Sequence, residues 1–152
     1  MELEYRVGNI DDIEDVFRLN RKVFDEAWSR SVMLESLQVG YDLFVCHQEE
    51  RLVAYILSQD ILFETQVMQL VVDQDFRRQG VAKKLMHMMI QDKQDIDLFI
   101  LEVRASNVCA QTFYAQMGFE EIAKRPHYYA KTATKLSEDA VVMSLKQIGC
   151  TQ

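Results

Sequence analysis

A turn between an apolar strand and an amphipathic helix carries the residues best suited to bind an anion. The strand ends at residues 70–72, the turn covers 73–80, and a helix follows from Val81. A helix N-terminus presents free backbone N–H groups and the positive end of the helix dipole. Arg77 and Arg78 add positive charge, and Gly80 has no Cβ, so a ligand can approach the backbone closely. The pattern predicts a phosphate site, with an ordinary solvated connection as the alternative.

Three polar residues further along the chain could carry acid–base chemistry. Glu102 ends an apolar strand, so it is either a salt-bridge partner of Arg104 or another base, or a general base at a crevice. Asn107 starts the next helix, where it can cap the helix or contact a ligand. Tyr114 shares a helix face with Asn107 and is either a core aromatic with a solvated hydroxyl or a general acid.

Hydrophobic periodicity predicts the elements that position these residues. The order is one strand, two helices, three strands, a helix, a strand, a helix and two strands. We expect strands near 3–7, 43–47, 52–58, 65–72, 96–103, 119–124 and 140–145, and helices over 11–23, after Ser29, from 81, and over 107–117. A long polar loop carrying His127, Tyr128 and Tyr129 should join the last two strands.

This order predicts an α/β (α+β) fold, a mixed and mostly antiparallel sheet flanked by helices. The two strands that precede helices in the middle of the chain should be parallel neighbours. Their carboxyl ends should form the binding crevice.

The composition indicates one globular domain spanning residues 1–152, with 49% apolar residues. A net charge of −7 argues against a nucleic-acid partner and is compatible with attraction of a basic substrate. We expect no membrane span, because no apolar run is long enough. The charged N-terminal segment lacks a signal-peptide core, so a cytoplasmic location is expected.

The three cysteines have no C-x-x-C spacing. We expect Cys46 and Cys109 to be small buried hydrophobic residues and Cys150 to lie in a polar tail. His87 has no partner at metal-ligand spacing, so no metal is expected.

Several segments together resemble one family. The spacing Arg77-x-x-Gly80-x-Ala82 resembles the pyrophosphate turn of the GNAT superfamily of N-acetyltransferases. The remaining segments resemble its RimI branch, which acetylates the N-terminal α-amine of a ribosomal protein. They are Ala27-Trp28-Ser29, Leu101-Glu102-Val103-Arg104-Ala105-Ser106-Asn107, Phe113-Tyr114, Met117-Gly118-Phe119, Arg125-Pro126-His127-Tyr128-Tyr129 and Glu138-Asp139-Ala140-Val141-Val142-Met143.

The resemblance implies roles for individual residues. Glu102 matches the family's general base and Tyr114 its general acid, in direct transfer from acetyl-CoA within a ternary complex. Tyr128 and Tyr129 match the surface that binds a protein or peptide N-terminus. The coenzyme contacts are Leu70, Val71 and Val72 for the pantetheine arm, Arg77, Arg78, Gln79, Gly80, Val81, Ala82 and Lys83 for the pyrophosphate, and Asn107.

The chain also departs from the family. Gln66 and Gln69 lie on the earlier strand, where many GNAT enzymes carry a base, which favours Glu102. Ala27 and Ala130 replace prolines near the expected peptide-binding surface. Two alternatives remain: a GNAT enzyme for a lysine side chain or small amine, and a regulatory module that binds acyl-CoA without turnover.

Overall fold

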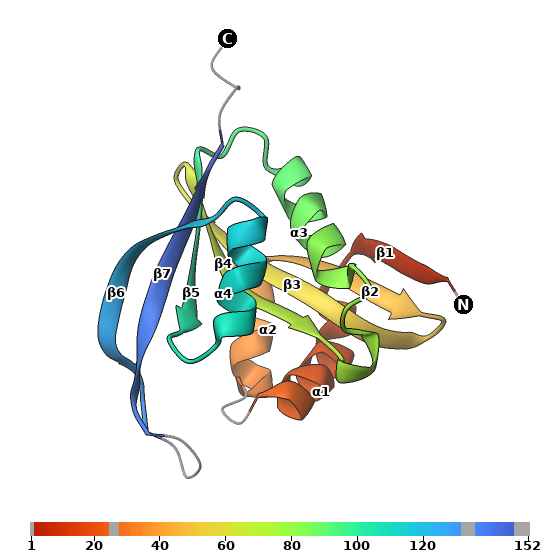
Figure 1. The fold of residues 1–152 in the computed structure, drawn as a ribbon. Helices are drawn as coiled ribbons and strands as arrows, with labels where there is room; N and C mark the ends of the chain where they lie inside the picture. The colour runs from red at the N-terminus through yellow and green to blue at the C-terminus, as the bar shows by residue number, and fades with distance from the viewer. Residues whose placement is uncertain (1, 25–27, 132–135, 148–152) are drawn as a thin grey trace. The chain divides into compact units, whose positions relative to one another are not determined.

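The computed structural model describes residues 2–24, 28–131 and 136–147. The order of helices and strands is the predicted one, with two short 3₁₀ helices in addition (Figure 1). The elements are β1 (Leu3–Val7), η1 (Ile10–Asp12), α1 (Ile13–Val23), α2 (Arg30–Gln38), β2 (Asp42–Gln48), β3 (Arg51–Ile61), β4 (Glu64–Val72), η2 (Gln74–Phe76), α3 (Val81–Asp92), β5 (Leu98–Arg104), α4 (Val108–Gln116), β6 (Glu120–Tyr129) and β7 (Glu138–Lys146).

The strands form a seven-stranded sheet in the order β1-β2-β3-β4-β5-β7-β6. β4 and β5 pair in parallel, with Glu64 opposite Leu98 and Gln66 opposite Ile100. The pairs β1/β2, β2/β3, β5/β7 and β6/β7 are antiparallel. The mixed, mostly antiparallel sheet and its parallel pair are therefore confirmed.

The chain divides into two compact units, and the interpretation as a single domain stays a prediction. The first unit contains residues 1–59 and 68–94, and the second contains 60–67 and 95–152. The phosphate turn belongs to the first unit, whereas Glu102, Tyr114 and the tyrosine pair belong to the second.

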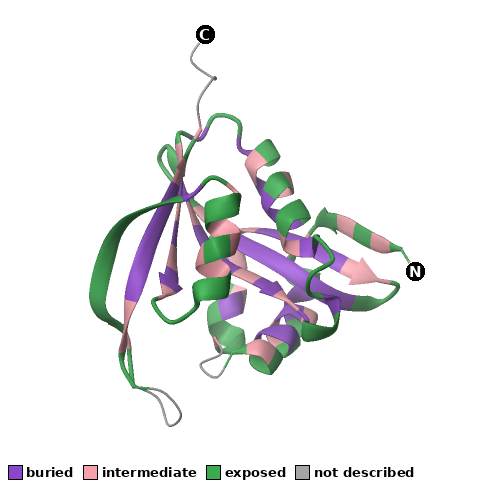
Figure 2. Cartoon of the chain, viewed as in Figure 1, coloured by how far each residue is buried: buried purple, intermediate pink, exposed green. Residues whose placement is uncertain are grey.

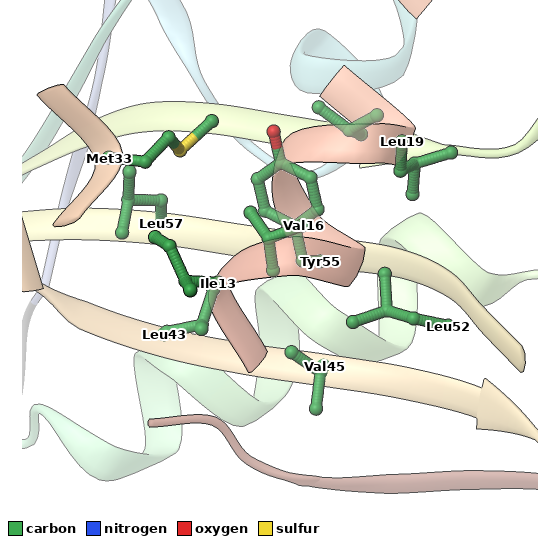
Figure 3. Packing of buried hydrophobic residues seen from close by; sticks show 10 residues of the cluster. Ile13, Val16, Leu19, Met33, Leu43, Val45, Leu52, Tyr55 and Leu57 are labelled. Atoms are coloured by element: carbon green, nitrogen blue, oxygen red, sulfur yellow. The ribbon is translucent and has the colours of Figure 1, made fainter. Parts of the chain in front are cut away.

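The core of the first unit forms where α1 and α2 pack on β2 and β3. Val16 and Leu19 of α1, Met33 of α2 and Tyr55 of β3 are buried in one cluster (Figure 3). Asn9 caps the start of this helical layer, because its side chain accepts a hydrogen bond from the Asp11 N–H and the Asp12 carboxylate completes a capping box. Burying this apolar surface stabilises the unit.

In the second unit, β7 is buried, whereas β6 is exposed along almost its whole length (Figure 2). The prediction of a loop at His127, Tyr128 and Tyr129 was wrong, because all three lie in β6. A polar strand with little buried surface has no apolar alternation to indicate it. Its backbone pairing with β7 forms the strand instead, with an irregularity between Arg125 and Tyr129.

Two further outcomes concern single residues. Cys46 is buried as expected, but Cys109 is exposed, because it lies in the first turn of α4, of which no residue is buried. Ala27 and Cys150 lie outside the described residues. Within the described part of the chain, no helix is long and apolar enough to cross a membrane.

Candidate active site

The phosphate turn begins with η2 and ends at α3. Phe76 is buried and fixes the middle of the turn to the core. The Arg77 side chain donates from Nε to the Val72 carbonyl oxygen at 3.3 Å, which folds the turn back on the end of β4. Arg78 and Gly80 have φ values of +63° and +77°, in the left-handed region. The turn is therefore a specific backbone conformation and not an open connection.

Gly80 is the N-cap of α3. The Lys84 N–H donates to the Gly80 carbonyl oxygen at 3.0 Å, which is the first hydrogen bond of the α-helix. The backbone N–H groups before Lys84 therefore lie ahead of the hydrogen bonds within the helix. A Cβ built on Gly80 would meet nothing within 4 Å, which shows open space beside it. Arg77, Arg78 and Gln79 are exposed next to this space. The arrangement suits a phosphate group.

Asp73 ties this turn to the rest of the first unit. Its side chain is 3% exposed and accepts from the Asp75 N–H at 3.1 Å, Lys22 at 3.0 Å and Arg51 at 2.9 Å. Burial alone would raise the pKa of Asp73, but the backbone hydrogen bond from Asp75 and the two cations outweigh it and lower the pKa. No local pattern in the sequence indicates this cluster of charged residues, because its members lie far apart in the chain.

A second buried network joins α1, β3 and β4 in the same unit. Gln69 accepts at Oε1 from the Tyr55 hydroxyl at 2.7 Å and from Asn20 Nδ2 at 3.1 Å. Asn20 Oδ1 in turn accepts from the Trp28 N–H at 3.0 Å. Asn20 is a buried residue of α1, and these hydrogen bonds explain why a polar side chain is tolerated there.

Glu102 lies on the half-buried face of β5, in the second unit. Its side chain is only 10% exposed, and Oε1 lies 3.2 Å from Nη1 of Arg125 on β6. A hydrogen bond to Glu102 raises the pKa of the Tyr128 hydroxyl. Of the two sequence interpretations, the salt bridge to Arg104 or another base is present, and the base is Arg125. A carboxylate is thus held against a tyrosine and a cation.

Arg104 has a different set of neighbours. Its Nη1 lies 3.3 Å from Glu138 Oε2, and its guanidinium lies 4.3 Å from the ring centre of Tyr129. Burial is the main cause that raises the pKa of Tyr129 to about 12. Tyr128 and Tyr129 themselves make an edge-to-face pair at 5.1 Å. The structure therefore gathers both tyrosines with Glu102.

Asn107 caps α4, which confirms one of its two predicted roles. Its Oδ1 accepts from the Ala110 N–H at 3.1 Å, and the coenzyme contact stays a prediction. Tyr114 lies two turns later, with its ring 5.3 Å from Phe113 and 5.8 Å from Phe119. Burial, aided by Tyr129, raises the pKa of Tyr114 to about 12. Its hydroxyl therefore stays protonated at neutral pH and can donate a proton.

Comparisons with known proteins identify the class of enzyme to which this fold belongs. The family model described as "Acetyltransferase (GNAT) domain" matches residues 10–132. The chain belongs to this family and is an N-acetyltransferase. The resemblance inferred from the pyrophosphate turn and the strand of Glu102 is confirmed at the level of the family.

Individual members of the family are similar to this chain over most of its length. The chain is 32% identical over 136 residues to the [Ribosomal protein bS18]-alanine N-acetyltransferase of Haemophilus ducreyi, covering 88% of this chain and 93% of that protein. It is 29% identical to the enzyme of the same name from Escherichia coli K12, with 88% and 90% coverage. The crystal structure of the Escherichia coli ribosomal-protein-S18-alanine N-acetyltransferase superposes with a TM-score of 0.90 at 26% identity, covering 99% of each chain.

Proposed function

We propose that this enzyme transfers the acetyl group of acetyl-CoA to the N-terminal α-amine of a protein, with a ribosomal protein as the first candidate. The similarity to bS18-alanine acetyltransferases over most of the chain supports this acceptor. The observation that carries the proposal is Glu102, a nearly buried carboxylate beside two tyrosines and the more exposed Arg125. A cytoplasmic location without a nucleic-acid or membrane partner is part of the same proposal.

Glu102 acts as the general base in this mechanism. An α-amine has a pKa of about 8, so most of it is protonated at neutral pH. Glu102 takes the proton, directly or through a water molecule, and the free amine attacks the thioester carbonyl carbon. A strand N–H near Val72 is proposed to polarise that carbonyl group.

Tyr114 completes the transfer. When the carbon–sulfur bond breaks, the sulfur leaves as a thiolate, and the Tyr114 hydroxyl supplies its proton. The attacking nitrogen loses a second proton as it becomes the amide, and this proton restores the Tyr114 hydroxyl. The products are an N-acetylated protein, free CoA and the proton taken from the ammonium group. The chemistry uses neither a metal nor a cysteine nucleophile, so the exposed Cys109 has no assigned role.

The phosphate turn binds the co-substrate. The free N–H groups at the start of α3, with Arg77, Arg78, Gln79 and Lys83, accommodate the pyrophosphate. The backbone of residues 70–72 pairs with the pantetheine arm. Tyr128 and Tyr129 line the place where the acceptor peptide lies, on a strand and not on the predicted loop.

A matched pair of peptides tests the acceptor. One peptide has a free α-amine and no lysine, and the other is blocked at its N-terminus but carries a lysine. We expect acetylation of the first alone, measured by mass spectrometry after incubation with acetyl-CoA. A free α-amine is the easier nucleophile, because its pKa of about 8 compares with about 10.4 for lysine.

The other outcomes identify the alternatives. Equal or faster acetylation of the blocked peptide would show a lysine or small-amine enzyme. Binding of acetyl-CoA without acceptor-dependent release of CoA would show a regulatory module.

A further inference from the structure

Arg125 is the cation that Glu102 holds in the free enzyme. The two side chains lie 3.2 Å apart, and their exposures differ sharply, at 56% for Arg125 and 10% for Glu102. The carboxylate therefore has a sheltered position, whereas its partner reaches it from the solvent side. A nearly buried carboxylate without a compensating cation is costly, which explains why a guanidinium occupies this place.

The surroundings of Arg125 allow it to leave. It lies on β6, whose residues are exposed except at the Tyr129 end (Figure 2). Its guanidinium also lies 5.4 Å from the ring centre of Tyr128, an exposed side chain on the same strand. The pairing of β6 with β7 is irregular between Arg125 and Tyr129, and His127 has a φ of +52°. None of these contacts buries the arginine.

Arg104 shows the contrasting arrangement of a fixed arginine. Its side chain is 20% exposed and pairs with Glu138, which is 19% exposed. It also lies close over the Tyr129 ring. The two arginines of this region thus differ in role: Arg104 is held in place, and Arg125 is the exchangeable one.

We propose that Arg125 occupies the position of the acceptor's ammonium group on Glu102 and is displaced when the acceptor binds. This inference rests on the proposed function, because it needs Glu102 to receive a protonated amine. The exchange replaces one cation by another, so Glu102 is never left buried without a partner. Arg125 is then a specificity-determining residue, because it competes with the ammonium group and so sets how strongly Glu102 favours a charged acceptor.

The same exchange favours product release. Transfer converts the ammonium group into a neutral amide, and its proton passes to Glu102 and then to solvent. The product has no cation to offer, so Arg125 returns to the carboxylate. Arg125 should therefore compete with the amine of the substrate for Glu102, but not with the amide of the product.

Binding of two peptides of one sequence tests this role. One has a free α-amine, the other is N-acetylated, and the dissociation constants are measured by calorimetry in the presence of CoA, so that no transfer occurs. Arg125→Gln should bind the free-amine peptide about two- to fivefold more tightly, the scale of an exposed ion pair that no longer competes. Binding of the acetylated peptide should not change.

Two variants act as controls. Lys124→Gln removes the same charge from the neighbouring exposed residue of β6, so it should change both peptides alike. Arg125→Lys keeps a cation and should restore the wild-type ratio between the peptides. A thermal melt of each variant shows that the fold is intact.

The outcomes separate this inference from the proposed function. If Arg125→Gln weakens binding of the free-amine peptide, or shifts both peptides equally, Arg125 is a structural or general binding residue and the inference is wrong. If the wild-type enzyme acetylates no free α-amine, the proposed function itself has failed.

Discussion

At the scale of single residues, the chemistry depends on a carboxylate and a phenol whose surroundings differ. Glu102 is nearly buried and pairs with the more exposed Arg125, whereas the half-buried Tyr114 packs against the rings of Phe113 and Phe119. A proton acceptor needs a path to its substrate, whereas a proton donor needs to stay protonated. Each group therefore matches the role proposed for it.

Glu102→Gln should lower turnover by roughly 10²- to 10⁴-fold at neutral pH, the usual scale for loss of a general base. The size of the side chain is kept, so acetyl-CoA binding should be unchanged. Activity should partly recover at high pH, where the amine loses its proton without help. Steady-state rates measured against pH check this, with Glu121→Gln on exposed β6 as the control. Wild-type turnover in Glu102→Gln would exclude the role.

Tyr114→Phe should lower turnover with little change in affinity for CoA, because only the hydroxyl is removed. The two aromatic neighbours should keep the ring in place. Since the pKa of Tyr114 is about 12, the wild-type enzyme should show no loss of this proton donor near neutral pH. Rates and CoA binding are measured separately. Full activity in the phenylalanine variant would leave Tyr114 as a core aromatic only.

At the scale of elements, substitutions in the turn between β4 and α3 test the proposed binding of acetyl-CoA. Arg78→Glu places a negative charge where the pyrophosphate is proposed to lie. The Michaelis constant for acetyl-CoA should rise about tenfold or more, the effect of losing one charged hydrogen bond. Arg78→Asn is a suitable comparison, because asparagine tolerates the left-handed φ of this position and adds no charge. An unchanged Michaelis constant in both variants would place the ligand elsewhere.

The anchor of the same turn predicts a pH dependence of stability. The pKa of Asp73 is lowered in the folded protein, so its contribution is present above the unfolded value of about 3.9 and is lost as the pH falls through the folded value. Asp73→Asn should flatten the acid limb of the melting temperature and raise the Michaelis constant for acetyl-CoA. Asp75→Asn is the control, because that side chain is 71% exposed. If the melting temperatures of the wild type and Asp73→Asn fall equally as the pH is lowered, Asp73 does not cause the acid sensitivity.

At the scale of the whole molecule, the net charge of −7 should favour basic acceptors. A peptide with arginine or lysine after its N-terminal residue should have a lower Michaelis constant than a neutral peptide of equal length. Salt should reduce the difference, because the Debye length falls to about 8 Å at physiological ionic strength. Rates at several salt concentrations check this. A salt-independent preference would assign selection to local contacts.

The sequence alone predicted the order of the elements, the Asn107 cap and the turn before α3. These features depend on residues within a few positions of each other, through periodicity, capping and left-handed glycine. They also carried the family resemblance, which the comparisons confirmed. The sequence therefore determined the class of enzyme and the residues to test.

Only the tertiary structure decided which residues are partners. Sequence spacing left Arg104 or another base as the partner of Glu102, and the pairing of β5 and β6 with β7 brings Arg125 to it. The first half of β6 was predicted as a strand, but its continuation through His127, Tyr128 and Tyr129 was missed, because these exposed residues show no apolar alternation and pairing with β7 forms the strand. The cluster of Asp73 with Lys22 and Arg51 was missed because its members lie far apart in the chain. Such contacts join distant parts of the chain, and their energy depends on burial and geometry that no local pattern of residues contains.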